Sequence, residues 1–217
     1  MKSNIKAKAY IFDFDGTLVD SMPTFVGAFF TLMEKHGIPH DGNTVKTITP
    51  LGYGGTAEYL ISLGMPLTKE EILYEVNAFA RDAYHNKIVC KRNVKETLLA
   101  LKARGDDLHV LTASPHTVLD ACLIRNGIYD LFTNVWSCED FATTKADPDI
   151  YRMAAERIGK PVEDVIFLDD NYDADKTAKS AGMTVYGVFD ESSRDYADDI
   201  RAITDRYITD FSELLED

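Results

Sequence analysis

Short apolar runs alternate with longer amphipathic stretches along most of the chain. Most of these runs are continuously apolar rather than alternating, and each is followed by polar or turn-forming residues. Runs of this kind are typical of strands covered on both faces, as in a parallel sheet. We expect strands at Ala9–Phe12, Leu108–Leu111, Asn134–Trp136, Val165–Leu168 and Val185–Val188, with a weaker one at Arg206–Ile208.

Helical patterns with clear start or stop signals separate these strands. An apolar stripe that begins at Val94 stops at Gly105, and glycine commonly follows the last residue of a helix. Ser114-Pro115 and Asp147-Pro148 each read as an N-cap followed by proline in the first helical position. Because strand and helix alternate from about Val94 onward, we expect a doubly wound α/β domain.

The segment between the first and second strands contains helical patterns and no convincing strand. Thr68 with Glu71 three residues later is the signature of a capping box. We therefore expect two domains, an α/β core of residues 1–20 and 91–217 and an inserted α-helical cap of residues 21–90. The expected cap helices are Pro23–His36, Thr56–Leu63 and Lys69–His85.

Composition and charge exclude several classes of protein. The 217-residue chain is 45% hydrophobic and 27% charged, as in ordinary globular proteins. Its formal net charge of −13 repels a phosphate backbone, so we expect no nucleic-acid partner. The three cysteines form no metal or disulfide pattern, and no apolar run approaches the roughly 20 residues that cross a bilayer. We expect a cytoplasmic monomer with no membrane partner.

The end of the first strand carries a pair of acids. Asp13 and Asp15 lie two residues apart, so on an extended chain both carboxylates project to the same side. Ligands bind at this edge of open α/β sheets. A hard divalent cation such as Mg²⁺ would relieve the repulsion between the acids. One acid could serve as a nucleophile and the other as a general acid and base, although such a pair alone equally suits a turn or helix cap.

Three further strand ends carry residues suited to the same chemistry. Thr112-Ala113-Ser114 offers hydroxyl and backbone N–H groups to a phosphate, although the serine alone is better explained as an N-cap. Lys145 could pair with a phosphate, although a lone lysine is more often solvated. Asp169-Asp170 suggests a metal, although aspartate is common at helix N-termini. Each signal is weak alone, and the ordered set predicts one site.

With these residues the chain resembles the haloacid dehalogenase superfamily, specifically its phosphatase branch with a helical cap. Residues 13–17 (DFDGT) resemble the DxDGT signature that begins the family's motifs. Thr112, Lys145 and Asp169-Asp170 match the second, third and fourth motifs in order. The resemblance covers essentially the whole chain and implies a Rossmann-like core with an inserted cap.

The resemblance implies a role for each matched residue. Asp13 would be the nucleophile that forms an aspartyl phosphate, and Asp15 the general acid and base. Thr112 and the Ala113 backbone would bind phosphate. Lys145 would stabilise the nucleophile and the oxygens in transfer, and would contact phosphate as well.

Mg²⁺ is the cofactor that the resemblance implies. Its ligands would be the Asp13 carboxylate, the Asp15 carbonyl and the Asp170 carboxylate. Asp169 stands where the family commonly has glycine, and it would join the metal site directly or through water. For the remaining acid of the fourth motif we favour Asp175, outside the direct ligands.

These residues lead to one function and two alternatives. The leading interpretation is a Mg²⁺-dependent hydrolase of a small phosphorylated metabolite. A β-phosphoglucomutase-like sugar-phosphate mutase is the first alternative, but such proteins usually carry a histidine where this chain has Phe25. A catalytically inert protein that binds ligands through the same fold is the second, and it is less favoured because Asp13, Asp15 and Lys145 are all present.

Two further positions bear on the cap. Arg92-Asn93 stands in place of the Pro-Gly pair common in the family before the helix at Val94, a departure from the family pattern at the cap hinge. Tyr53, in the glycine-rich stretch of residues 52–55, is a candidate for substrate contact, and a packed loop residue is an equally good interpretation.

Overall fold

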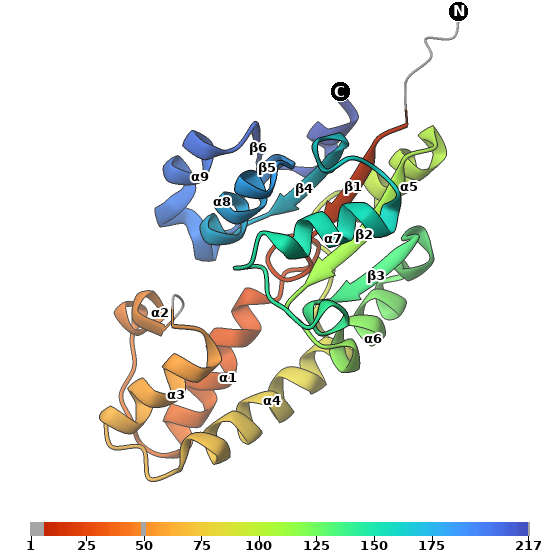
Figure 1. Ribbon diagram of the computed structural model, residues 1–217. Helices are drawn as coiled ribbons and strands as arrows, with labels where there is room; N and C mark the ends of the chain where they lie inside the picture. The colour runs from red at the N-terminus through yellow and green to blue at the C-terminus, as the bar shows by residue number, and fades with distance from the viewer. Residues whose placement is uncertain (1–6, 49–50, 217) are drawn as a thin grey trace, which may run out of the picture. The chain divides into compact units, whose positions relative to one another are not determined.

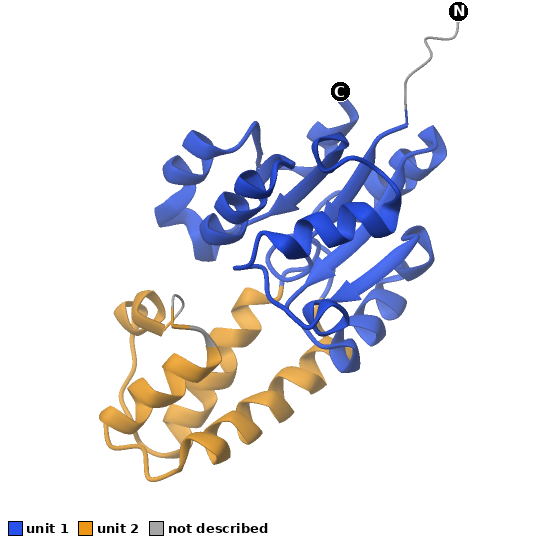
Figure 2. Cartoon of the chain, in the orientation of Figure 1, with its two compact units in different colours: residues 1–20, 89–217 blue, residues 21–88 orange. Residues whose placement is uncertain are grey.

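The computed structural model describes residues 7–48 and 51–216. The chain divides into two compact units, Met1–Asp20 with Val89–Asp217 and the inserted Ser21–Ile88 (Figure 2). The chain returns to the first unit two residues before residue 91, where we expected the boundary. Hydrogen bonding explains the difference, because the Asp20 N–H donates to the Val89 carbonyl and Val19 bridges to Cys90.

The first unit is built on a six-stranded parallel sheet with strand order β3-β2-β1-β4-β5-β6 (Figure 1). Every strand lies within one residue of its expected bounds at either end, which confirms the predicted α/β core. The strands are β1 Ala9–Phe12, β2 Asp107–Thr112, β3 Asn134–Ser137, β4 Val165–Asp169, β5 Thr184–Val188 and β6 Arg206–Ile208.

Helices of the first unit cover the central strands on both faces. Ile11 and Phe167 pack in a buried cluster with residues of α7 and α8, and Tyr151 of α7 meets Phe167 edge to face. On the opposite face, Phe12 contacts the rings of Phe132 and Phe211. Burial on both sides explains why these strands are apolar throughout. The helices are α5 Val94–Arg104, α6 His116–Asn126, α7 Asp149–Ile158, α8 Tyr172–Ala181 and α9 Ala197–Ile203.

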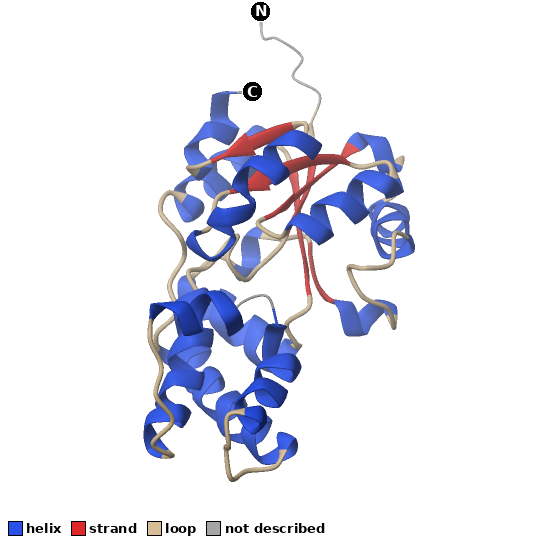
Figure 3. Ribbon diagram, turned by 90° about the vertical axis from the view of Figure 1, so that its left-hand side faces the viewer, coloured by secondary structure: helices blue, strands red, loops and turns tan. Residues whose placement is uncertain are grey.

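The inserted unit is helical in the part that the structure describes (Figure 3). The predicted capping box is confirmed at α4, where Thr68 Oγ1 accepts from the Glu71 N–H at 3.2 Å and the Glu71 carboxylate accepts from the Thr68 N–H at 2.8 Å. The helices are α1 Met22–Lys35, α2 Gly42–Ile48, α3 Gly52–Ser62 and α4 Lys69–Asn86. No helix among the described residues is both long enough and apolar enough to cross a membrane.

Two residues singled out in the sequence lie in the aromatic core of this unit. The Phe25 ring centroid lies 5.1 Å from that of Phe29 and 5.0 Å from that of Tyr53. The glycine-rich stretch that contains Tyr53 forms the first turn of α3 rather than a loop. The position where mutases usually carry histidine therefore holds a packed apolar ring.

Two helices of the core begin one residue later than the Ser-Pro and Asp-Pro pairs predict. α6 has Pro115 as its N-cap and α7 has Pro148. Asp147 still accepts a helix N–H, that of Asp149, at 3.0 Å. Ser114 makes no such capping bond, so its hydroxyl serves another partner.

β2 buries a histidine against an aromatic ring. His109 is fully buried, and its ring stacks on Trp136 with centroids 5.5 Å apart. The Asn134 side-chain amide lies 3.0 Å from His109 Nδ1, whereas Asp107 Oδ2 lies 3.2 Å from Nε2 outside hydrogen-bond geometry. Burial lowers the pKa of His109 below its ordinary value, against the attraction of Asp107.

We expect His109 to make the core less stable in acid. The folded state favours the neutral ring of His109. The contribution of this ring to stability is therefore complete above the unfolded pKa of about 6.5, and it is lost as the pH falls from there toward the lowered pKa of the folded state. Between about pH 7.5 and about pH 5, the free energy of unfolding should fall further in the wild type than in His109→Gln. Urea denaturation measures both proteins, and equal losses would contradict this account.

Candidate active site

The predicted site residues meet at one edge of the sheet. β1 lies between β2 and β4, so the carboxyl ends of these three strands are neighbours (Figure 1). Asp13 directly follows β1, Thr112 ends β2 and Asp169 ends β4. The Asp13 N–H donates to the Leu168 carbonyl at 2.8 Å, which extends the β1–β4 pairing up to the acid. The segment after β3 adds Lys145, whose amine reaches the same edge.

Lys145 joins two of the carboxylates. Its Nζ lies 2.6 Å from Asp13 Oδ1 and 2.7 Å from Asp169 Oδ2, and its side chain is only 15% exposed. It is therefore no solvated surface lysine. Burial alone would lower the pKa of Lys145, but Asp13 and Asp169 raise it well above its ordinary value, so the amine stays charged. The Tyr151 hydroxyl donates to the Lys145 carbonyl at 3.0 Å and fixes the backbone beneath it.

Asp170 faces the turn that follows Asp15. The Thr17 hydroxyl donates to Asp170 Oδ1 at 3.1 Å. Gly16 has a φ of +74°, and a Cβ at this position would lie 2.5 Å from Asp170 Oδ2. Glycine is thus required here both by the backbone conformation and by the close approach of the carboxylate.

The described part of the site holds more buried acid than buried base. Oxygens of Asp13, Asp169 and Asp170 lie within 4.8 Å of one another, and both oxygens of Asp175 lack a hydrogen-bond partner among the described residues. Burial, then the charge of Asp169, raises the pKa of Asp175 to about 10. The same causes raise that of Asp170 well above normal, and burial raises that of Asp13 to about 8 despite Lys145. Closely spaced oxygen ligands with excess negative charge fit a hard divalent cation such as Mg²⁺.

Asp15 has a partner on the neighbouring loop. The Ser114 hydroxyl donates to Asp15 Oδ2 at 2.5 Å, and the Ser114 N–H donates to Thr112 Oγ1 at 3.0 Å. Thr112 is buried, whereas Ala113 between them is exposed. The loop after β2 therefore contacts the acid predicted to transfer protons, a contact that the N-cap interpretation of Ser114 missed.

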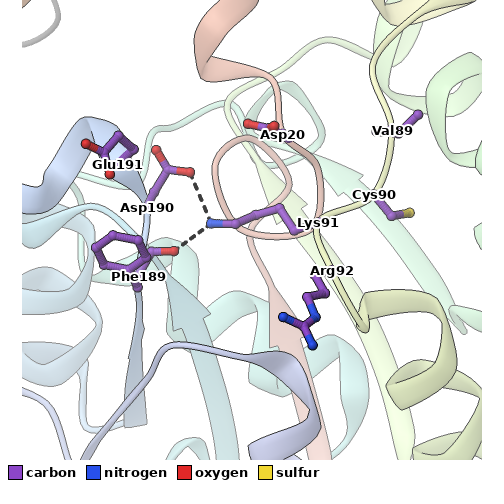
Figure 4. A pocket seen from close by; sticks show the side chains of 8 residues that line it. All are labelled: Asp20, Val89, Cys90, Lys91, Arg92, Phe189, Asp190 and Glu191. Atoms are coloured by element: carbon purple, nitrogen blue, oxygen red, sulfur yellow. Dashed lines mark hydrogen bonds and ion pairs between the residues drawn. The ribbon is translucent and has the colours of Figure 1, made fainter.

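Lys91 lies close to the site and was not identified from the sequence. Figure 4 shows it beside Asp190 in a pocket of the core unit. Its amine donates to the Gly16 and Phe189 carbonyls, each at 2.6 Å, and to Asp190 Oδ2 at 3.0 Å. It thus joins the turn beside Asp170 to the end of β5. No local pattern distinguishes this lysine from an exposed one, because its partners are 75 to 99 residues away.

The structure explains how the chain dispenses with Pro-Gly before α5. Asn93 adopts a φ of +61°, a left-handed conformation that asparagine tolerates better than most residues. Its side-chain amide donates to both oxygens of Asp210, at 2.8 and 2.9 Å. Asparagine therefore supplies the backbone conformation of the usual glycine and ties this segment to the end of the core.

Removing the Lys91 amine should destabilise the core unit. Lys91→Met leaves two carbonyls and the buried Asp190 carboxylate without this donor. Breaking a buried pair costs about 3–5 kcal/mol, and the partial exposure of Lys91 puts the expected loss near the lower end, about 3 kcal/mol. Lys102→Met, on the exposed surface of α5, is the control and should change the free energy of unfolding by less than about 0.5 kcal/mol. Similar small changes in both variants, measured by urea denaturation, would refute this role.

Known proteins resemble this chain along most of its length. A family model described as haloacid dehalogenase-like hydrolase matches residues 7–182, a range that includes every acid of the site from Asp13 to Asp175. A phosphoglycolate phosphatase from Psychrobacter arcticus is 30% identical over 220 residues, covering 95% of this chain and 93% of that protein. A phosphorylated carbohydrates phosphatase from Thermotoga maritima is 28% identical over 191 residues, covering 83% and 85%.

A solved structure shares the fold. The crystal structure of a candidate β-phosphoglucomutase from Thermotoga maritima superposes with a TM-score of 0.79 and covers 96% of this chain and 97% of that one. At 23% sequence identity, this likeness is evidence for the fold alone.

Proposed function

The protein belongs to the haloacid dehalogenase-like hydrolases, and on that basis we propose that it hydrolyses a small phosphorylated metabolite with Mg²⁺ and an aspartyl-phosphate intermediate. Two of its relatives are named as phosphatases, which supports a phosphoric monoester hydrolase. The observation that carries the assignment to this site is the buried Lys145 amine held between Asp13 and Asp169.

Asp13 is the proposed nucleophile. Lys145 favours the ionised form of Asp13 and fixes its orientation through the 2.6 Å contact to Oδ1. A carboxylate oxygen of Asp13 forms a bond to phosphorus while the bond from phosphorus to the leaving oxygen breaks. Asp15 gives its proton to that leaving oxygen.

Water completes the reaction in a second displacement. Water gives a proton to Asp15 and its oxygen bonds to phosphorus, as the bond between phosphorus and Asp13 breaks. The second step yields inorganic phosphate, the free Asp13 carboxylate and Asp15 in its protonated form, ready for the next cycle. Asp15 thus acts first as an acid and then as a base, and its side chain must hold one position through both steps.

Phosphate would be held by the end of β2 and by Lys145. Thr112 Oγ1 accepts from the Ser114 N–H, and its own hydroxyl proton can be donated to a phosphate oxygen. The Ala113 N–H is the second proposed donor, at an exposed position of the same loop. Lys145 would oppose the charge that builds on the oxygens in transfer.

Mg²⁺ would be held by the Asp13 carboxylate, the Asp15 carbonyl and Asp170. When bound, it offsets the charge of the acids and of the phosphoryl group in transfer. Both oxygens of Asp169 already accept hydrogen bonds, from Lys145 at 2.7 Å and from the Asn171 N–H at 2.8 Å, which favours a role through water. We assign Asp175 to the surroundings of the metal rather than to its direct ligands.

The two alternatives gain no support from the site. Phe25 packs in an aromatic core and offers no proton to a second sugar phosphate. An inert binding protein has no need of a buried lysine held against the predicted nucleophile. Supplying a β-hexose phosphate with its bisphosphate tests for mutase activity directly.

Asp13→Asn should abolish phosphate release. We expect a panel of phosphorylated metabolites to identify substrates, and kcat on the best of them to fall at least about 10³-fold in the variant, because the amide is a poor nucleophile. Asp198→Asn removes a carboxylate whose side chain is 99% exposed and should leave kcat unchanged. Substantial turnover by Asp13→Asn would rule out this nucleophile.

Removal of Mg²⁺ should stop turnover reversibly. Chelation with EDTA should abolish phosphate release, and added Mg²⁺ should restore it. Asp170→Asn should weaken Mg²⁺ binding by at least about 10-fold in calorimetric titration, because a direct carboxylate ligand is lost. Full activity in the chelated protein, or unchanged Mg²⁺ affinity in the variant, would contradict the proposed metal site.

A further inference from the structure

The hydroxyl of Ser114 is committed to Asp15 rather than to the helix that follows it. Ser114 Oγ lies 2.5 Å from Asp15 Oδ2, at the short end of the range for a hydroxyl that donates to a carboxylate. α6 begins at His116, its N-cap is Pro115, and that cap makes no side-chain hydrogen bond. The short contact to an acid 99 residues earlier in the chain is therefore no by-product of helix capping.

The two hydroxyl groups of the loop after β2 have different roles. Thr112 Oγ1 accepts from the Ser114 N–H at 3.0 Å, which fixes the loop, and its own proton can be given to a ligand. The single hydroxyl proton of Ser114 points to Asp15 Oδ2, so it cannot also be given to a phosphate oxygen. Ser114 is thus placed to act on the proton-transferring acid and not on the phosphoryl group.

We propose that Ser114 is a positioning residue for Asp15, whose Oδ2 it holds while the carboxyl group transfers the proton. This inference rests on the proposed function, in which Asp15 is the general acid and base. When Asp15 is ionised, Ser114 donates to Oδ2. When Asp15 carries a proton on Oδ1, the other oxygen still accepts, so the hydrogen bond persists through both steps.

In the first step, the effect of misplacing Asp15 depends on the leaving group. As the bond from Asp13 to phosphorus forms and the bond to the leaving oxygen breaks, the electron pair stays on that oxygen, which takes the proton from the Asp15 carboxyl group. A poor leaving group depends on this proton, whereas a strongly acidic phenol departs as its anion without it. Misplacing Asp15 should therefore slow substrates in proportion to how poorly their leaving group departs.

Phenyl phosphate and 2,4-dinitrophenyl phosphate are matched probes, because they share a ring and differ mainly in leaving-group acidity. The quantity to measure is kcat/KM, which covers the reaction up to the departure of the phenol. For Ser114→Ala we expect kcat/KM to fall at least about 10-fold on phenyl phosphate and less than about 3-fold on 2,4-dinitrophenyl phosphate. Ser114→Thr keeps the hydroxyl and should restore most of the loss.

The ratio of the two values of kcat/KM is independent of the fraction of each variant that is folded, so misfolding cannot imitate the result. An equal loss on both substrates, as a phosphate-binding or purely structural role would give, would overturn the inference. So would an unchanged value on phenyl phosphate.

Asp15→Asn separates this inference from the proposed function. Its loss of kcat/KM on phenyl phosphate should exceed its loss on 2,4-dinitrophenyl phosphate by at least as large a factor as in Ser114→Ala. If Asp15→Asn discriminates and Ser114→Ala does not, the role of Ser114 alone is wrong. If Asp15→Asn does not discriminate either, the assignment of Asp15 as the acid fails, and the inference fails with it.

Discussion

Repulsion among carboxylates that are buried close together is the constraint on which this site depends. Asp13, Asp169 and Asp170 are buried with oxygens within 4.8 Å of one another, an arrangement that is unfavourable without positive charge. The Lys145 amine offsets part of it through its contacts to Asp13 and Asp169. Burial first, and then the charge of Asp169, raises the pKa values of Asp170 and Asp175. The negative charge that remains is what the proposed Mg²⁺ would balance, and a phosphoryl group would in turn be drawn to the cation and the lysine.

The fold brings the acids together and keeps them in place. The parallel order of β2, β1 and β4 sets three strand ends beside one another, so residues far apart in sequence need no long loops to meet. The turn after Asp15 then fits tightly, since Gly16 leaves room for the Asp170 carboxylate. The Lys91 amine donates to the carbonyl of that glycine at 2.6 Å. Polar contacts around the site thus hold the short turn that follows Asp15 in place.

The sequence predicted the sheet better than the cap, for physical reasons. Central strands buried on both faces are mostly apolar runs, which stand out from their surroundings, and all six strands were located, including the less apolar β6. α2 escaped notice because among its seven residues only Thr44 and Ile48 are buried, too few to form an apolar stripe. The glycines of residues 52–55 suggested a loop, yet they begin α3, where packing of Tyr53 on Phe25 outweighs their low helix propensity.

Site residues at strand ends could likewise be located, but their partners could not. The positions of Asp13, Lys145 and Asp169 follow from strand order, while the bond from Lys145 to Asp169 depends on side-chain geometry. Ser114 and Lys91 each look ordinary in their local sequence, and each gains its meaning from a contact to the segment after β1. The local sequence pattern indicates which chemistry a residue can carry out, whereas its partner depends on the tertiary fold.

Direct detection of phosphate on Asp13 tests the central claim most sharply. Asp15→Asn supplied with 2,4-dinitrophenyl phosphate and Mg²⁺ should pass the first step, because the leaving group needs no proton, and should stall at the second, because water has no base. After an acid quench, mass spectrometry should find a phosphoryl group on the peptide that contains Asp13, and none in the Asp13→Asn, Asp15→Asn double variant. Release of dinitrophenol without any phosphoryl group on that peptide would contradict the account.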